Sequence, residues 1–246
     1  MMDLLREHAR RAADPLLSPY SRAPVGVAVA DDAGRWLAAP RVESASYPLS
    51  IPALQGVWAL ASIHGLRPAA VALSRPATGE ERAFVQATWP WLDPSDGAFG
   101  AVRVPPHPSA LDLTEAGAAD DVARAAARRA VVPASDFRVG AALRDTSGRL
   151  VFGANVEHPS DWTRGLCAER VALVAGLASG LAAIESVTVV CESAPGGSPC
   201  GGCRQLLAEY APDAEVRIWT GQEPLVTSPS ALLPGAFVGS SLGGTR

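Results

Sequence analysis

Apolar residues along the chain follow first a helical and then a strand-like spacing, and this order occurs twice. Residues that share one helical face open each half of the sequence: Leu4, Leu5 and Ala9, then Val122, Ala125 and Ala126. In each half this pattern is followed by short apolar runs bounded by Gly, Asp and Ser, which predict strands. The chain therefore predicts two similar sets of elements.

The second half gives the clearer set. The predicted elements are, in order, a hairpin with strands over 139–143 and 150–156 and a turn over 145–148, a helix over 168–179, a strand over 187–190, a helix after Cys203, and a strand over 216–219. Strands that alternate with helices predict an α/β fold, in which helices pack on the faces of a sheet.

The two halves also share residues in a constant register. Matching residues lie 114 positions apart: Pro19 and Pro133, Ser21 and Ser135, Val25-Gly26 and Val139-Gly140, Gly34-Arg35 and Gly148-Arg149, and Val42-Glu43 and Val156-Glu157. The spacing becomes 115 where Gly65 matches Gly180 at the end of an apolar helix. A register that holds over roughly fifty residues indicates an internal duplication.

A proline-rich stretch separates the two copies. The sequence Val104-Pro-Pro-His-Pro-Ser109 removes backbone donors and favours an extended linker. We therefore predict a first domain over 1–103, a linker over 104–116 and a second domain over 117–246.

The composition predicts folded domains with small partners. Hydrophobic residues make up 48% of the 246 residues, which is enough for buried cores. The net charge is −4 and no dense run of Lys or Arg occurs, which argues against binding to nucleic acid or to an anionic membrane. The start of the sequence lacks the apolar core of a signal peptide, and glycines interrupt the apolar stretch 171–191. We therefore expect a cytoplasmic protein without a membrane span.

Four cysteines lie in the last third of the chain, and three of them form a pattern typical of a zinc site. Cys200 and Cys203 form a CxxC pair, and Cys167 precedes them with Glu169 two residues further on. A catalytic zinc ion keeps three protein ligands and an open position for water, so we predict one such Zn²⁺ per chain. Cys191 as a fourth ligand is the alternative, but it ends an apolar strand, where a buried free thiol is common. A redox CxxC pair is the weaker alternative, because it leaves Cys167 without a role.

Both cysteine segments are predicted to open helices. A helix N-terminus directs free N–H groups and a partial positive charge at a ligand, which favours thiolates. Three thiolates and a hydroxide nevertheless outweigh the charge of the zinc ion. We expect Arg170, and to a lesser degree Arg204, to offset the remaining negative charge; solvated side chains are the alternative for both.

Five ordered motifs of the second half resemble those of the cytidine deaminase family. They are Phe137-Arg-Val-Gly-Ala-Ala-Leu143, Asn155-Val-Glu157, Cys167-Ala-Glu-Arg170, Pro199-Cys-Gly-Gly-Cys-Arg-Gln205 and Leu232-Leu-Pro-Gly-Ala-Phe237. The resemblance implies two tandem three-layer α/β/α domains, each with a mixed sheet of about five strands flanked by helices. It also implies zinc-dependent hydrolytic deamination of cytidine or 2′-deoxycytidine.

The resemblance implies roles for single residues. The implied substrate-binding residues are Phe137, Asn155, Glu157, Ala168 and Phe237. Phe137 would pack on the pyrimidine, Asn155 and Glu157 would bind ribose hydroxyls, and Phe237 would reach the site of a neighbouring domain. Glu169 would take a proton from water activated by zinc and pass it to cytosine N3 and then to the leaving ammonia. A core position is the alternative for both phenylalanines.

The first copy lacks the residues that this chemistry needs. Three replacements remove them: Pro52 for Cys167, Leu54 for Glu169, and Ala77-Thr-Gly-Glu-Glu81 for the segment around Cys200. We therefore expect a non-catalytic domain. It keeps Ala45-Ser46-Tyr47, a stretch that by the resemblance completes a neighbour's pocket. We predict that two chains form a homodimer of four domains, in which Tyr47 lines the pocket of an active domain; packing at a domain interface is the alternative.

One departure from the family pattern leaves the substrate open. The sequence His158-Pro-Ser-Asp-Trp162 replaces the usual residues of a part that is implied to shape the pocket beside the sugar. Deamination of a modified or antibiotic cytosine nucleoside, such as blasticidin S, is therefore an alternative. A zinc-stabilised binding protein without turnover is another, which the retention of Glu169 disfavours.

Overall fold

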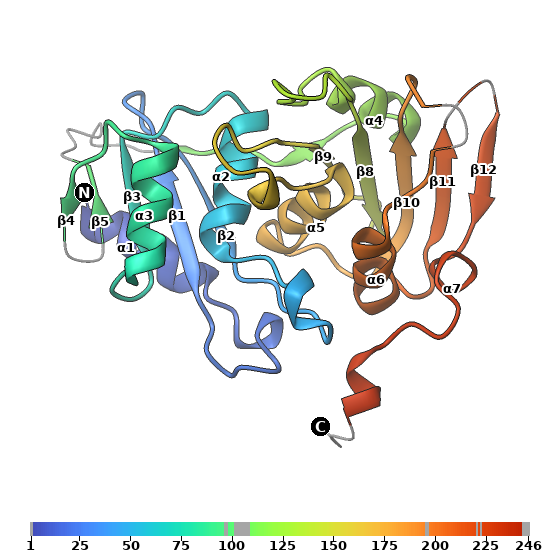
Figure 1. Cartoon of the computed structure of the whole chain (residues 1–246), viewed down its shortest axis with the longest axis horizontal. Coiled ribbons are helices and arrows are strands. Elements are labelled where there is room, and N and C mark those ends of the chain that lie inside the picture. Colours follow the sequence, from blue (N-terminus) through green and yellow to red (C-terminus); the bar gives the residue numbers. More distant parts are fainter. Residues whose placement is uncertain are drawn as a thin grey trace. The chain divides into compact units, whose positions relative to one another are not determined.

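The first copy folds into helices packed on a mixed sheet (Figure 1). The computed structural model describes residues 2–95, 98–100, 109–194, 197–219, 221 and 223–242. The first-copy helices are α1 (Met2–Ala12), α2 (Ala53–Ile63) and α3 (Gly79–Thr88). The strand order is β4-β5-β3-β1-β2-β6, with β1 over Gly26–Ala30, β2 over Arg35–Pro40, β3 over Ala70–Leu73, β4 over Pro94–Ser95, β5 over Ala98–Phe99 and β6 over Ser109–Ala110. Only β2 and β6 pair in parallel among these described strands.

The second copy repeats the three central strands of this sheet, since β10-β8-β9 matches β3-β1-β2, and differs in the pairing of the outer strands. Its helices are α4 (Ala119–Ala127), α5 (Ala168–Ala178), α6 (Gly201–Tyr210) and α7 (Pro229–Leu232). The strand order is β12-β11-β10-β8-β9-β7, with β7 over Thr114–Glu115, β8 over Gly140–Asp145, β9 over Leu150–Ala154, β10 over Ile184–Val190, β11 over Glu215–Trp219 and β12 over Pro224–Thr227. Within the described residues each sheet has six strands instead of about five, because the two-residue strands β6 and β7 each add an edge.

Helices cover both faces of the second sheet, and two glycines allow their close approach. A Cβ atom at Gly140 would lie 2.0 Å from the carbonyl oxygen of Ala123 in α4, and one at Gly153 would lie 2.2 Å from the nitrogen of Ala172 in α5. Ala141 pairs with Gly153, so Gly140 and Gly153 face opposite sides of the sheet. This confirms the predicted layered α/β fold.

The packing of α1 repeats that of α4. A Cβ atom at Gly26 would lie 2.1 Å from the carbonyl oxygen of Ala9, and both residues match their second-copy counterparts at the spacing of 114. The predicted helix faces were wrong at two positions, because Leu4 is 41% exposed and Ala125 is also exposed. The buried face centres instead on the alanine that contacts each glycine.

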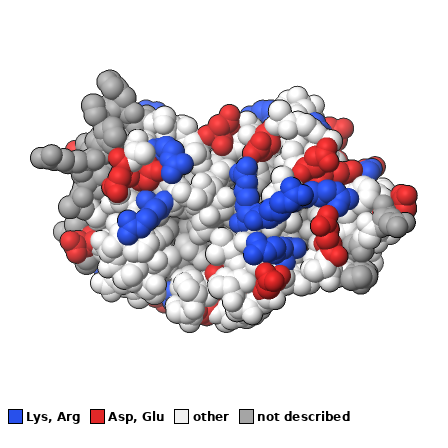
Figure 2. Space-filling model, turned by 90° about the horizontal axis from the view of Figure 1, so that it is seen from above, with Lys and Arg blue, Asp and Glu red and all other residues white. Residues whose placement is uncertain are grey.

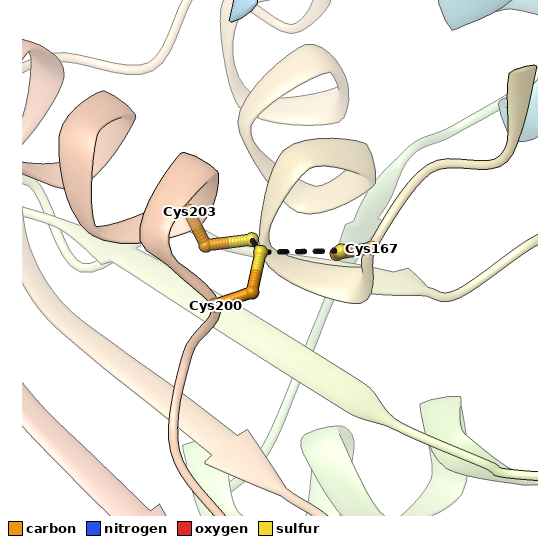
Figure 3. A group of neighbouring side chains, drawn as sticks. All are labelled: Cys167, Cys200 and Cys203. Carbon is orange, nitrogen blue, oxygen red and sulfur yellow. Dashed lines mark hydrogen bonds between the residues drawn. The ribbon is translucent and has the colours of Figure 1, made fainter. Parts of the chain in front are cut away.

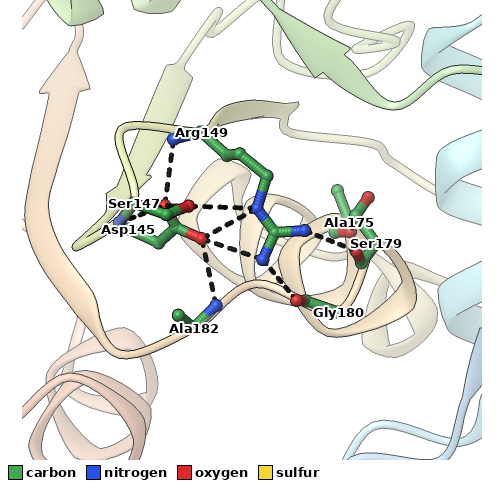
Figure 4. Close-up of polar contacts among 7 residues, drawn as sticks. All are labelled: Asp145, Ser147, Arg149, Ala175, Ser179, Gly180 and Ala182. Carbon is green, nitrogen blue, oxygen red and sulfur yellow. Dashed lines mark hydrogen bonds and ion pairs between the residues drawn. The ribbon is translucent and has the colours of Figure 1, made fainter.

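A buried aspartate locks the turn between β8 and β9 (Figure 4). One oxygen of Asp145 accepts hydrogen bonds from the backbone and hydroxyl of Ser147 and from the backbone of Arg149. The other oxygen accepts from Arg149 Nε and from the nitrogen of Ala182, just before β10. These bonds, above all the one from the Ser147 hydroxyl, hold the pKa of Asp145 well below its usual range. One carboxylate thus ties the hairpin turn to the next strand of the sheet.

The chain divides into two compact units whose limits differ from those of the copies. Unit 1 comprises Met1–Val42, Ile51–Asp112 and His158–Arg164, and unit 2 comprises Glu43–Ser50, Leu113–Glu157 and Gly165–Arg246. Segment 43–50 of the first copy therefore belongs to unit 2, and segment 158–164 of the second copy belongs to unit 1. The two segments occupy matching positions of the repeat, so the exchange is reciprocal. Residues 104–108 of the predicted linker lie outside the described residues.

Candidate metal centre

Two helix N-termini bring three cysteines together (Figure 3). Cys167 is the N-cap of α5, Cys200 is the N-cap of α6, and Cys203 lies in the first turn of α6. The Sγ atom of Cys200 lies 3.7 Å from that of Cys167 and 3.6 Å from that of Cys203. The three predicted metal ligands thus converge on one point.

The spacing of the sulfur atoms fits a zinc ion. Three thiolates at about 2.3 Å from one ion, at tetrahedral angles, lie about 3.8 Å apart, close to the observed separations. Three ligands leave a fourth position open, as in catalytic zinc sites. Within the part of the chain that the structure describes, this is the one group of three or more His, Cys, Asp or Glu side chains with metal-binding spacing.

The cluster needs a cation to ionise fully. Hydrogen bonds from the thiols of Cys167 and Cys203, together with backbone N–H groups at the start of α6, lower the pKa of Cys200. The same sulfur contacts, followed by burial, raise the pKa of Cys203. Without a metal the cluster therefore favours one thiolate held by two thiols. Ionisation of all three requires a divalent cation among them.

The two arginines near the ligands contact backbone and hydroxyl oxygens. Arg170 Nη2 donates to the carbonyl oxygen of Leu49 at 3.0 Å. Arg204 donates to three oxygens: Pro199 O at 2.7 Å, Ser198 Oγ at 2.7 Å and Leu232 O at 3.0 Å. Arg204 therefore fixes the loop that leads into Cys200. The neutralising role expected of Arg170 stays a prediction.

A cavity of about 180 Å³ opens beside the cysteines. Its lining residues are Phe137, Val139, Asn155, Cys167, Ala168, Glu169, Val189, Cys191, Gly197, Ser198, Cys200 and Ile218. Glu169 is only 5% exposed, and burial raises the pKa of its carboxyl, with negative charge on Cys200 acting in the same direction. A carboxyl group that holds a proton more readily than an exposed glutamate thus lies in the same cavity as two metal ligands.

Three of the predicted substrate-binding residues, Phe137, Ala168 and Asn155, line this cavity. Phe137 is 43% exposed, so part of its ring is free to contact a ligand. The amide of Asn155 accepts a hydrogen bond from Val139 N at 2.8 Å and donates one to Phe137 O at 2.7 Å. Asn155 therefore fixes the backbone on both sides of residue 138 and so orients Phe137.

The other three predicted residues are not among those that line the cavity. Glu157 accepts hydrogen bonds from Ala134 N at 2.8 Å, from Ser135 N at 3.2 Å and from the Ser135 hydroxyl. Burial alone would raise the pKa of Glu157, but these bonds lower it, and they hold the loop before Phe137. Phe237 is 46% exposed and Tyr47 is 84% exposed.

The apolar residues that line the cavity were not predicted from the sequence. Val189 in β10 pairs directly with Ile218 in β11, and both line the cavity together with Val139 and Cys191. An apolar strand residue gives the same sequence signal whether it faces a core or a cavity. For Cys191, the one signal in the sequence that it faces the cavity was its position after a predicted strand and before the CxxC pair.

The unusual segment after Glu157 packs within unit 1. The ring of His158 is 5.1 Å from that of Trp58 and 5.5 Å from that of Phe84, and its Nε2 lies 2.9 Å from Thr88 Oγ1. All of these residues belong to unit 1. The expectation that segment 158–162 shapes the pocket stays a prediction.

The surface charges offer little for a polyanion. On the face shown in Figure 2, acidic side chains border the basic ones. Several arginines form ion pairs, including Arg124 with Glu192 at 2.6 Å and Arg217 with Asp120 at 3.5 Å. Of the helices in the described residues, none combines the length and apolar character that crossing a bilayer requires.

Comparison with known proteins gives one family for both copies. A family model described as the cytidine and deoxycytidylate deaminase zinc-binding region matches residues 115–218, and a second model with the same description matches residues 2–73. The duplication inferred from the repeat is thereby confirmed.

Individual relatives align with the length of one copy. A cytidine deaminase of Halalkalibacterium halodurans is 39% identical over 119 residues, which cover 46% of this chain and 86% of that protein. One of Sporosarcina psychrophila is 36% identical over 114 residues, which cover 46% of this chain and 83% of that protein. The crystal structure of cytidine deaminase from Burkholderia pseudomallei shares 40% identity with a TM-score of 0.46 and covers 48% of this chain and 96% of that one.

Proposed function

The chain belongs to the cytidine deaminase family, and from this premise we propose that it converts cytidine and 2′-deoxycytidine to uridine and 2′-deoxyuridine with release of ammonia. The observation that carries the proposal is the cavity that holds Glu169 beside Cys167 and Cys200. A structural zinc site has no use for a buried carboxyl group at this place, so a zinc-stabilised binding protein without turnover is disfavoured.

Each residue of the site has a distinct role in the proposed deamination. Cys167, Cys200 and Cys203 hold the zinc ion, which when bound activates water as a nucleophile at neutral pH. Glu169 would accept one proton from that water and deliver it to cytosine N3; it would then accept the remaining proton from the hydroxyl group added at C4 and deliver it to the leaving amine, which departs as ammonia. Its raised pKa favours uptake of a proton. Phe137 packs on the pyrimidine ring.

The lining favours a nucleoside over a nucleotide. None of the described residues that line the cavity is Arg or Lys, and the buried Glu169 and the thiolates are negative or become so. A phosphate group binds where cationic side chains or several N–H donors meet it. We therefore expect weak activity on CMP.

An ultraviolet assay of the purified protein tests the proposal. Cytidine, 2′-deoxycytidine, cytosine, CMP and blasticidin S are compared at equal concentration, and loss of the cytosine absorbance is followed. We expect turnover of the two nucleosides first. Blasticidin S represents the alternative of a modified or antibiotic cytosine nucleoside, and its turnover in preference to cytidine would reject the proposed substrates.

The division of labour between the copies is part of this proposal. We assign catalysis to 117–246 and a non-catalytic role to 1–103. Two chains would pair as a homodimer of four domains, with Tyr47 and Phe237 reaching the cavity of the other chain. The exposure of both aromatic rings leaves them available for such contacts. Thiolate ligands require reduced cysteines, so we place the protein in the cytoplasm.

A further inference from the structure

Segment 43–50 belongs to the unit that carries the cysteines, although the sequence on both sides of it belongs to the other unit. The segment is closed on itself. Ser44 N donates to Ser50 Oγ at 3.0 Å, and Ser46 N donates to Ser44 Oγ at 3.1 Å. It is therefore a short closed loop and not an extended connection.

Glu209, near the end of α6, binds the start of this loop. One carboxylate oxygen accepts from the Ser44 hydroxyl at 2.5 Å, and the other accepts from Ala45 N at 2.7 Å. The next residue of the helix, Tyr210, donates its hydroxyl to the carbonyl oxygen of Glu43 at 2.5 Å. Hydrogen bonds to an ionised carboxylate are stronger than those between neutral groups. Ser44 is 2% exposed, so water hardly competes for this contact.

The end of the loop contacts both cysteine helices. The carbonyl oxygen of Leu49 accepts from Arg170 of α5. A Cβ atom at Gly202, in the first turn of α6, would lie 3.1 Å from Leu49 Cδ2 and 4.0 Å from the Sγ of Cys200. Leu49 therefore packs closely against the turn that carries two metal ligands.

We propose that Glu209 is a positioning residue of the metal centre and acts through loop 43–50. The loop that it anchors presents Leu49 to α5 and α6 at once, and the N-caps of these helices are Cys167 and Cys200. Holding the two helix ends together keeps the sulfur atoms at the spacing of a bound zinc ion. This inference rests on the zinc site of the proposed function and concerns retention of the metal, not the choice of substrate.

The variant Glu209→Gln in the full-length, zinc-loaded protein tests this role. Glutamine has nearly the same size, but it lacks the charge and turns an N–H₂ group toward groups that donate to the carboxylate, which are Ser44 Oγ, Ala45 N and Gln205 Nε2. Release of zinc to the chelating dye pyridylazoresorcinol is followed by absorbance. We expect release to be about 10-fold faster than in the wild type, the scale on which groups that orient metal ligands affect affinity. Glu215→Gln, at a side chain 52% exposed in β11 of the same unit, should release zinc at the wild-type rate.

A second variant and a second readout keep the test decisive. Ser44→Ala removes the hydroxyl that donates to Glu209 and accepts from Ser46 N. It keeps the bond from Ala45 N to Glu209 and leaves α6 unchanged, so it should accelerate release to a smaller extent and serves if Glu209→Gln folds poorly. If Glu209 only stabilises the fold, its substitution should lower the Tm of the zinc-free and the zinc-loaded protein equally. If it positions the metal ligands, the substitution should reduce the difference in Tm between the two forms. Release within about twofold of wild type in both variants, or equal lowering of both Tm values, overturns the proposal.

The readout is independent of turnover. A protein that deaminates nothing but releases zinc faster in both variants would reject the proposed function and keep this inference. A protein that deaminates cytidine but releases zinc at an unchanged rate would do the reverse.

Discussion

Glu169 meets two requirements of a proton shuttle in one position. It follows the N-cap Cys167 by two residues, so the first turn of α5 directs its carboxyl into the cavity that the ligand lines. Burial raises its pKa, so its carboxylate takes up a proton more readily than that of an exposed glutamate. Uptake of a proton from water is the first task of a proton shuttle.

Glu169→Gln should abolish turnover and leave the fold and the zinc content intact. The amide keeps the size of the side chain but cannot carry a proton between water and the pyrimidine. The expected loss in kcat is at least about 10²- to 10⁴-fold. It is measured with cytidine, alongside metal analysis and circular dichroism. A variant that kept a tenth of the wild-type rate would contradict the assigned role.

His158 provides a test of stability against pH. Burial, and then the charge of Arg164, lower the pKa of His158, against a smaller opposing effect of Asp161. In the unfolded chain a histidine titrates near about 6.5, so below that pH the unfolded state binds the proton more readily. The resulting stability is present at neutral pH and is lost as the pH falls.

His158→Gln should reduce this acid sensitivity. Glutamine can still bond to Thr88 but does not become charged. We expect the Tm of the wild type to fall further between pH 7 and pH 5 than that of the variant, as followed by differential scanning fluorimetry. The comparison uses the slope with pH, because the variant also loses the ring contacts with Trp58 and Phe84. Equal slopes would show that His158 does not titrate in this range.

Among single residues, the sequence predicted the reactive groups of the site better than the other residues around them. Three thiols and a carboxyl at fixed spacings leave few alternatives, because the chemistry of each residue is visible in its type. Glu157 was expected to bind the sugar, yet its carboxylate is bonded to the loop at 134–135. A polar residue gives no sign in the sequence of whether it will face a ligand or a backbone N–H group.

At the scale of elements, the two copies begin matching helices in different ways. In the second copy Cys167 and Cys200 are N-caps without a side-chain capping hydrogen bond. In the first copy Pro52 caps α2, and Thr78 and Glu81 form a capping box at the start of α3. The difference lies in α3 and α6, because the first turn of α3 is capped by side chains whereas that of α6 starts at two predicted zinc ligands. Pro52 makes no side-chain capping bond at α2, as Cys167 makes none at α5.

Thr78→Ala should therefore lower the free energy of unfolding by about 1 kcal/mol, while zinc content and kcat stay unchanged. The hydroxyl accepts a hydrogen bond from Glu81 N at 3.2 Å, and alanine removes that acceptor. Tryptophan fluorescence during urea unfolding reports on the change, since Trp36, Trp58, Trp89, Trp91 and Trp162 all lie in unit 1. Thr78→Ser keeps the acceptor and serves as the control. A loss of zinc in Thr78→Ala would contradict the expectation that the start of α3 does not affect the metal centre.

The helices and the hairpin were predictable because their signals are local. Periodicity, glycine turns and the apolar runs place α5, β8 and β9 within a few residues of their bounds. The exchange of 43–50 and 158–164 between the units was not predictable. Several contacts that hold these segments use backbone groups, such as Leu49 O with Arg170 and Arg164 O with Gln55 Nε2. The side-chain contacts, such as Ser44 with Glu209, join residues far apart in the sequence, and no local pattern marks them.

At the scale of the whole molecule, a duplicated chain with one cysteine cluster should bind one zinc ion. The family model matches both copies, but the cluster of thiols among the described residues lies only in the second. Mass spectrometry of the metals in the purified protein should give a ratio near one, and Cys200→Ser should bring it close to zero. A ratio near two would mean that the first copy holds a metal through other residues.

In the proposed homodimer, the exposed Tyr47 contacts the substrate in the cavity of the partner chain. Its side chain is 84% exposed, although a tyrosine with a large apolar ring favours at least partial burial. If its hydroxyl bonds to the substrate in the cavity of a partner chain, Tyr47→Phe should raise KM for cytidine about 3- to 10-fold, the range for one lost hydrogen bond. Zinc content, kcat and Tm should stay near the wild-type values, and Tyr20→Phe serves as the matched control. Unchanged kinetics in Tyr47→Phe, or full activity of a chain that light scattering shows to be monomeric, would mean that no partner chain completes the site.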